Sequence, residues 1–190
     1  MRKLNKLRPA VAVFALCFAL GAQALEVGGV KLEERIKQGN AELVLNGAGI
    51  RTKVFFKVYV GALYATQKTN NAAALIDGGG KRMSLTLLRD LDADSLFGAL
   101  KDGLAANHSE AEMTALKPQV DQLAEIMKKI GGGKTGNVID LDFTADGLAV
   151  AFNGEAKGKV AGAAFNKAML KIWLGDDPVD ASLKKALLGS

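Results

Sequence analysis

The chain has 190 residues, with 25 lysines and arginines against 20 acidic residues and an isoelectric point near 9.3. A basic chain raises the question of nucleic-acid binding, which needs basic side chains gathered on one surface. No such block stands out in the sequence, so we exclude a nucleic-acid partner.

The first 24 residues have the three parts of a secretory signal peptide. A basic start is followed by the uncharged apolar run 10–20 and by the small-x-small sequence Ala22-Gln23-Ala24. This run is too short to cross a bilayer, for which about 20 apolar residues are needed. We therefore expect cleavage after Ala24. The basic start consists of Arg2, Lys3, Lys6 and Arg8.

Cleavage would change the charge and the chemistry of the chain. Removing four of the 25 basic residues leaves 21 against 20 acidic ones, so residues 25–190 are nearly neutral. The single cysteine, Cys17, would be lost, which excludes disulfides and thiol chemistry. Leu16 is also a poor match to the small residue that precedes a lipidated cysteine. We predict one periplasmic or secreted domain, residues 25–190, without a transmembrane anchor.

The first half of this domain has the alternation of β-strands. Gly28-Gly29 inside 27–32 predicts a hairpin turn, and 41–46 predicts a strand. The strongest strand is 54–65, and 83–88 is another. The even positions of 54–65 are all apolar or aromatic, which predicts one fully buried face and one partly buried face. These even positions are Val54, Phe56, Val58, Val60, Ala62 and Tyr64.

The period then changes to that of helices. Asp92 is a candidate N-cap for a helix with the apolar stripe Leu96, Leu100 and Leu104. Ser109 with Glu112 has the spacing of a capping box. The stripe that follows contains Pro118, which should kink or split the helix. Its apolar members are Met113, Leu116, Val120, Leu123, Met127 and Ile130.

Strands return before the last helices. We expect strands at 138–143, 148–152 and 155–160, a helix with the stripe Phe165 to Trp173, and a short helix starting at Asp177-Pro178. Strands first, helices in the middle, a hairpin and then helices predict an α+β domain, with a mostly antiparallel sheet covered by helices on one face.

Two motifs resemble the chalcone isomerase family. The glycine-rich segment 46–51, which ends in Arg51, precedes the strand 56–64, which ends in Tyr64. Near the end, 174–179 with Leu183-Lys184 resembles the family's closing helix. The resemblance implies an open-faced β-sandwich, in which helices cover a large antiparallel sheet and leave a cleft. Some members cyclise chalcones to flavanones, and others bind fatty acids.

The resemblance also implies roles for single residues. Arg51 matches the arginine that holds the anionic substrate in the enzymes. Tyr59 stands where the enzymes have a threonine, as in the fatty-acid-binding members. The enzymes use a tyrosine, a lysine and an asparagine on a helix that matches 94–100, and this segment has neither tyrosine nor lysine. We therefore favour a protein without catalytic activity.

The sequence leaves open whether Arg51 and Tyr59 meet. On one continuous strand, eight residues at ~3.3 Å each would separate them by ~26 Å. They reach one ligand only if the chain turns near Lys53. Otherwise Arg51 is a surface arginine or pairs with an acid such as Asp142, and Tyr59 is a packed strand aromatic. Tyr64 lies on the opposite face and is interpreted as structural.

Our hypothesis is a non-catalytic domain that binds a hydrophobic anion, such as a fatty acid, between sheet and helices, with no cofactor or metal. Arg51 and Tyr59 would hold the carboxylate. The predicted apolar lining is Phe55, Leu63, Leu96, Phe97 and Leu100.

Three alternatives stay open. An intramolecular lyase or isomerase would use Arg51 to stabilise an oxyanion on an unidentified small substrate. A haem protein would use His108 as the axial ligand. A purely structural protein would fill the cleft with its own side chains.

Overall fold

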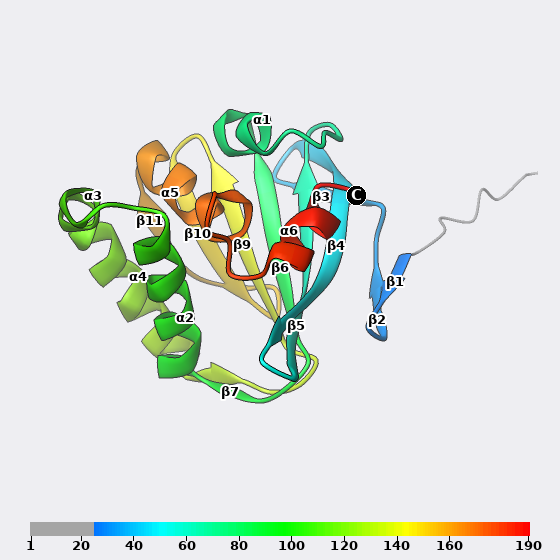
Figure 1. Cartoon of the computed structure of the whole chain (residues 1–190), viewed down its shortest axis with the longest axis horizontal. Helices are drawn as coiled ribbons and strands as arrows, with labels where there is room; N and C mark the ends of the chain where they lie inside the picture. Colours follow the sequence, from blue (N-terminus) through cyan, green and yellow to red (C-terminus); the bar gives the residue numbers. More distant parts are fainter. Residues whose placement is uncertain (1–24) are drawn as a thin grey trace, which may run out of the picture.

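The structure is a computed structural model, and it describes residues 25–190 (Figure 1). The predicted signal peptide, residues 1–24 with Cys17, lies outside the described residues. Within the described part, no helix is long and apolar enough to span a membrane.

A seven-stranded antiparallel sheet forms the centre of the fold, in the order β11-β10-β9-β6-β5-β4-β3. A separate hairpin, β1 (Leu25–Val27) and β2 (Val30–Leu32), turns at the predicted glycines, and β7 (Leu91–Asp92) pairs with β8 (Gly132–Gly133). The strands of the large sheet are β3 (Arg35–Gln38), β4 (Ala41–Lys53), β5 (Phe56–Ala65), β6 (Lys81–Leu87), β9 (Val138–Thr144), β10 (Gly147–Phe152) and β11 (Glu155–Ala161).

Helices cover one face of this sheet (Figure 1). The larger buried cluster lies between them and the sheet, whereas a smaller cluster on the other face packs under β1 and β2. The α+β architecture expected from the sequence is confirmed. The helices are α1 (Ala72–Asp77), α2 (Ala93–Ala106), α3 (Glu110–Ala115), α4 (Lys117–Ile130), α5 (Ala163–Leu174) and α6 (Ala181–Leu187).

The helix signals in the middle of the chain are confirmed. Asp92 caps α2 by accepting a hydrogen bond from the Ser95 N–H. Ser109 and Glu112 form a complete capping box at α3. Pro118 stands in the first turn of α4, where its missing N–H costs no helical hydrogen bond, and the predicted long stripe is thereby split into two helices.

The glycine-rich segment 46–51 is part of a strand, so the strand predicted at 41–46 is longer than expected. Strand β4 runs through it to Lys53, and the chain turns only at Val54-Phe55. The glycines allow α6 to lie directly on the strand. A Cβ at Gly47 would be 2.1 Å from the Ala186 carbonyl oxygen, and one at Gly49 would be 2.7 Å from the Ala186 Cβ.

Hydrogen bonds hold both ends of α6 to β4. Asn46 is an extra residue in the ladder, and its Nδ2 donates to the Leu187 carbonyl oxygen at 2.7 Å. At the other end, the Asp180 carboxylate caps α6 and accepts from the Thr52 N–H at 2.9 Å. The helix therefore begins after Asp180 and not at Pro178 as predicted, because Asp180 supplies the cap.

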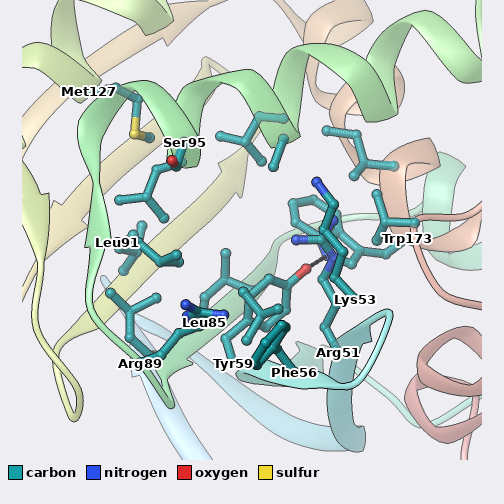
Figure 2. Close-up of a pocket in the computed structure, with 18 of the residues that line it drawn as sticks. Arg51, Lys53, Phe56, Tyr59, Leu85, Arg89, Leu91, Ser95, Met127 and Trp173 are labelled. Carbon is teal, nitrogen blue, oxygen red and sulfur yellow. Dashed lines mark hydrogen bonds between the residues drawn. The ribbon is translucent and has the colours of Figure 1, made fainter.

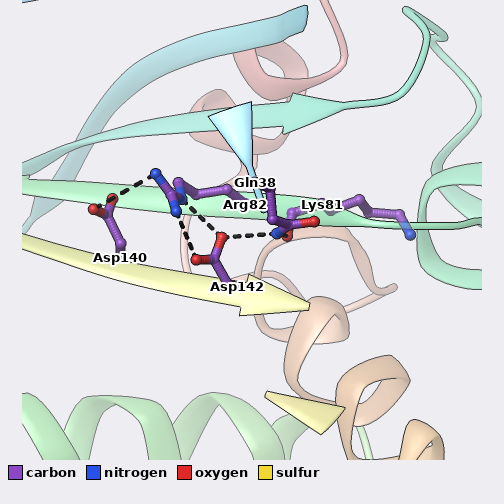
Figure 3. Close-up of polar contacts among 5 residues, drawn as sticks. All are labelled: Gln38, Lys81, Arg82, Asp140 and Asp142. Carbon is purple, nitrogen blue, oxygen red and sulfur yellow. Dashed lines mark hydrogen bonds and ion pairs between the residues drawn. The ribbon is translucent and has the colours of Figure 1, made fainter. Parts of the chain in front are cut away.

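A polar cluster fixes the register between β6 and β9 on the face that carries Tyr64 (Figure 3). The Arg82 guanidinium donates two hydrogen bonds to the Asp142 carboxylate, at 2.7 and 2.6 Å. The Gln38 side chain donates to the same carboxylate. Asp142 thus pairs with Arg82 rather than with Arg51. Tyr64 is buried on this face, as predicted, and away from Tyr59.

The close approach of α6 can be tested by adding one methyl group. Gly47→Ala should lower the free energy of unfolding by about 1–3 kcal/mol, because rigid backbone leaves no room for the new carbon. Gly98→Ala on α2 is the control, since nothing lies within 4 Å of its added carbon, and it should stabilise by about 0.5–1 kcal/mol. Urea unfolding of both variants measures the difference. If Gly47→Ala were as stable as the original protein, the close contact between α6 and β4 would be contradicted.

Candidate functional site

Arg51 and Tyr59 meet because the chain turns directly after Lys53. They are cross-strand partners, and the Arg51 Cζ lies 5.6 Å from the centroid of the Tyr59 ring. A β-bulge follows this pair, since Thr52 pairs with Lys57 and leaves Val58 as an extra residue. The bulge directs both Val58 and Tyr59 to the helix side of the sheet.

A cavity of about 380 Å³ lies beside this pair, between the sheet and helices α2, α4 and α5. In Figure 2, Arg51, Lys53 and Tyr59 gather at one end beside Trp173, and Leu91, Ser95 and Met127 lie at the other. The apolar lining is Val54, Phe56, Val58, Leu85, Leu87, Leu91, Leu96, Ala99, Leu100, Met127, Ile139, Leu141, Ile172 and Val179. An apolar cavity with a few polar groups is the usual form of a small-molecule site.

The Arg51 side chain has an unused hydrogen-bond donor. Its Nε is buried and, among residues 25–190, finds no hydrogen-bond partner. A buried donor without an acceptor is costly, and more so on a charged group. An anion in the cavity would remove this cost, because a guanidinium binds a carboxylate through two parallel hydrogen bonds.

Tyr59 is held as a second donor. The Trp173 Nε1–H donates to the Tyr59 hydroxyl oxygen at 2.8 Å in the buried core. This bond leaves the Tyr59 proton for another acceptor. Burial raises the pKa of the Tyr59 hydroxyl to about 12, and the nearby Arg51 charge opposes this shift. The phenol is therefore neutral and able to donate at any physiological pH.

The charged residues of the cavity are all positive. Lys53 and Arg89 line it together with Arg51, and within the described part of the chain no aspartate or glutamate does. The Arg89 Cζ lies 4.8 Å from the centroid of the Phe56 ring, which places this cation beside the turn. The cavity is therefore suited to an anion with an apolar body.

Four of the seven predicted ligand residues line the cavity: Arg51, Tyr59, Leu96 and Leu100. The other three do not. Phe55 is 90% exposed at the turn, Leu63 is fully buried in the core, and Phe97 packs half-buried against it from α2. The prediction assumed that side chains alternate without interruption along 54–65. In the structure, Phe55 belongs to the turn and not to the strand, and the bulge places Val58 on the cavity side of the sheet.

Sequence reasoning missed Lys53, Arg89 and Trp173. Trp173 carried one signal, since it is the single tryptophan and falls in a helical apolar stripe. Its hydrogen bond joins residues 114 positions apart, so no local pattern could reveal the pairing.

His108 lies away from this cavity. It is half-buried after α2, with Nδ1 at 2.8 Å from the Leu104 carbonyl oxygen, and it borders a separate groove beside α1, α3 and α5. Within residues 25–190, no cluster of three histidine, cysteine or acidic side chains could hold a metal ion.

Comparison with known proteins identifies a family and a similar solved structure. A family model described as chalcone isomerase-like matches residues 24–189. Among solved structures, the crystal structure of a fatty-acid binding protein from Arabidopsis thaliana is similar, with a TM-score of 0.69 and 16% sequence identity over 84% of this chain and 92% of that chain. At this identity the similarity shows the fold alone. No curated protein matches.

The burial of the tyrosines can be tested by titration. Burial raises the pKa of Tyr59 and that of Tyr64 to about 12, so tyrosinate absorbance of the native protein should rise near pH 12, and near pH 10 after denaturation. The unfolded state then loses its protons first, and stability should fall from pH 10 to 12 by about 1.4 kcal/mol per pH unit for each tyrosine. In Tyr59→Phe, the free energy of unfolding should fall with pH only by the contribution of Tyr64. A native midpoint near pH 10 would contradict the buried hydroxyls.

Proposed function

The chain belongs to the chalcone isomerase-like family, and we propose that it is a non-catalytic protein that binds a hydrophobic anion, such as a fatty acid, in the cavity beside Arg51. The observation that carries the proposal is the buried Arg51 Nε, which has no acceptor within residues 25–190 and lies on a cavity without acidic side chains.

A carboxylate fits the donors at this end of the cavity. The Arg51 guanidinium would bind it through charge-assisted hydrogen bonds, and the neutral Tyr59 hydroxyl would donate a further one. Lys53 adds positive charge at the same end. The acyl chain would then contact the leucines of β6 and α2, where burial of methylene groups stabilises the complex.

The same residues argue against catalysis. General acid–base chemistry needs a group whose pKa lies near the working pH. Among the described lining residues there is no histidine, aspartate, glutamate or cysteine, and the pKa of Tyr59 is about 12. The Ser95 hydroxyl already donates to Asp92 at 3.0 Å. A purely structural role is also disfavoured, because it requires a filled cleft beside Arg51.

Removing the Arg51 charge should weaken carboxylate binding by about 10- to 100-fold, since hydrogen bonds to a charged group contribute about 1.5–3 kcal/mol. Arg51→Met keeps the apolar bulk, and Arg35→Met is the matched control, because Arg35 is exposed and pairs with Glu42. Calorimetry with lauric and palmitic acid measures the difference. The methyl esters should not distinguish Arg51→Met from the original protein. If Arg51→Met and the original protein bound the free acids with equal affinity, Arg51 would not be a ligand of the carboxylate.

Native mass spectrometry of the protein purified from a bacterial periplasm should show a bound mass that matches a fatty acid and is lost on denaturation. We also propose export, because of the signal-peptide pattern in residues 1–24, so the protein mass should correspond to a chain that begins at Leu25. A mass without an adduct that accepts no fatty acid on titration would contradict the binding proposal. A cytoplasmic, uncleaved chain would contradict export alone.

A further inference from the structure

The turn between β4 and β5 carries three consecutive exposed apolar side chains, which we call the apolar tip. Val54 is 76% exposed, Phe55 90% and Phe56 60%. Within residues 25–190 the only other large apolar side chain that is exposed is Leu25, at 46%. Apolar side chains concentrated at one projecting point mark a contact surface, because isolated domains cover such groups.

The backbone of the apolar tip is strained as well. Val54 has φ 59°, a conformation that a β-branched residue rarely adopts and that hairpin turns normally assign to glycine or asparagine. Elsewhere the described chain follows this rule: the β1–β2 hairpin uses Gly28-Gly29, and the β10–β11 hairpin uses Asn153-Gly154. Folding alone would favour glycine at position 54, so the valine indicates a role outside the fold.

Positive charge surrounds the apolar tip. Lys53 and Lys57 flank it and are exposed, and the Arg89 guanidinium lies over the Phe56 ring. No acidic residue occurs between Glu42 and Asp77. Of the acids in neighbouring segments, Asp90 pairs with Lys134 at 2.9 Å and Asp180 accepts from the Thr52 N–H. Asp102 and Asp177 border a separate groove on the side of Arg51 and Lys53, and neither lines the cavity.

The apolar tip also borders the cavity. Val54 and Phe56 line it together with Lys53 and Arg89, whereas Phe55 does not and is almost fully exposed. Figure 1 shows the β4–β5 hairpin at the lower end of the sheet, far from α3. A surface that contacts the apolar tip would therefore touch exposed residues that line the cavity.

We propose that the apolar tip inserts into the interface of a bilayer that contains anionic lipids, with Phe55 entering deepest. Aromatic side chains favour the headgroup region, and neighbouring lysines and arginines are attracted to anionic lipids. A protein partner fits less well, because a stable protein interface occupies about 20–30 residues a side and this contact offers three apolar ones. Direct passage of an amphiphilic anion between bilayer and cavity is a consequence that rests on the proposed function.

Vesicle binding tests the docking without any fatty acid. Vesicles of phosphatidylethanolamine and phosphatidylglycerol should bind the purified protein, and pure phosphatidylcholine vesicles should bind it less. Phe55→Ser should weaken sedimentation with the anionic vesicles by about tenfold, the scale of burying one phenyl side chain. Lys57→Glu should weaken it too, whereas Lys37→Glu, with the same change of charge on exposed β3, should not. Phe55 contacts no core, so its variant keeps the fold.

An introduced tryptophan reports where the chain touches the bilayer. Phe55→Trp should gain fluorescence that brominated lipids quench, and Ala111→Trp on exposed α3 should gain fluorescence that they do not quench. The native Trp173 is 1% exposed and serves as the internal background.

Unchanged vesicle binding of Phe55→Ser, or no quenching of Phe55→Trp, would overturn the proposal. So would a dimer that Phe55→Ser dissociates in the absence of vesicle binding, because the apolar tip would then join two copies of this chain. Vesicle binding through Phe55 without fatty-acid binding would support membrane docking and contradict the proposed function. Fatty-acid binding without vesicle binding would support the proposed function and contradict membrane docking.

Discussion

The fold depends on the contact between α6 and β4, where the helix backbone lies against Gly47 and the Ala186 side chain lies against Gly49, because neither glycine has a side chain. Asn46 and Asp180 fasten the helix at its two ends. With the helix seated there, β4 continues as a strand to Lys53, and the turn falls at Val54-Phe55. That position of the turn is what sets Arg51 opposite Tyr59. The pairing of Arg51 with Tyr59 beside the cavity thus depends on where this strand ends.

The Arg51 charge is partly buried, and burying a charge is unfavourable unless it is paired. The Arg51 guanidinium borders an apolar cavity, and its buried Nε–H has no acceptor among residues 25–190. Burial keeps the hydroxyl of the neighbouring Tyr59 neutral. Trp173 supports this arrangement from α5 by donating to the Tyr59 hydroxyl oxygen, so one helix and the β4–β5 hairpin together position Arg51 and Tyr59. An anionic ligand would compensate the Arg51 charge, whereas a neutral ligand would leave that charge unpaired.

The β4–β5 hairpin combines two properties that stability alone would not select. Its turn places valine where glycine is preferred, and its exposed phenylalanines sit among cations. Val54 and Phe56 of this hairpin also line the apolar cavity. Local strain and exposed apolar surface of this kind are typical of positions that serve a contact rather than the fold.

The elements whose signals are local could be predicted from the order of the amino acids. Asp92, the Ser109–Glu112 capping box and Pro118 set the helix ends, and alternation predicted most strands. The motif around Arg51 indicated the family and the residue proposed to bind an anion. Three features required the folded chain to be seen: the glycines make room for a helix, a bulge at Val58 changes the alternation, and Trp173 donates to Tyr59. Local patterns record backbone preferences within a few residues. Pairings between residues 114 or more apart, such as those of Trp173 with Tyr59 and Thr52 with Asp180, arise from packing, and no local pattern contains them.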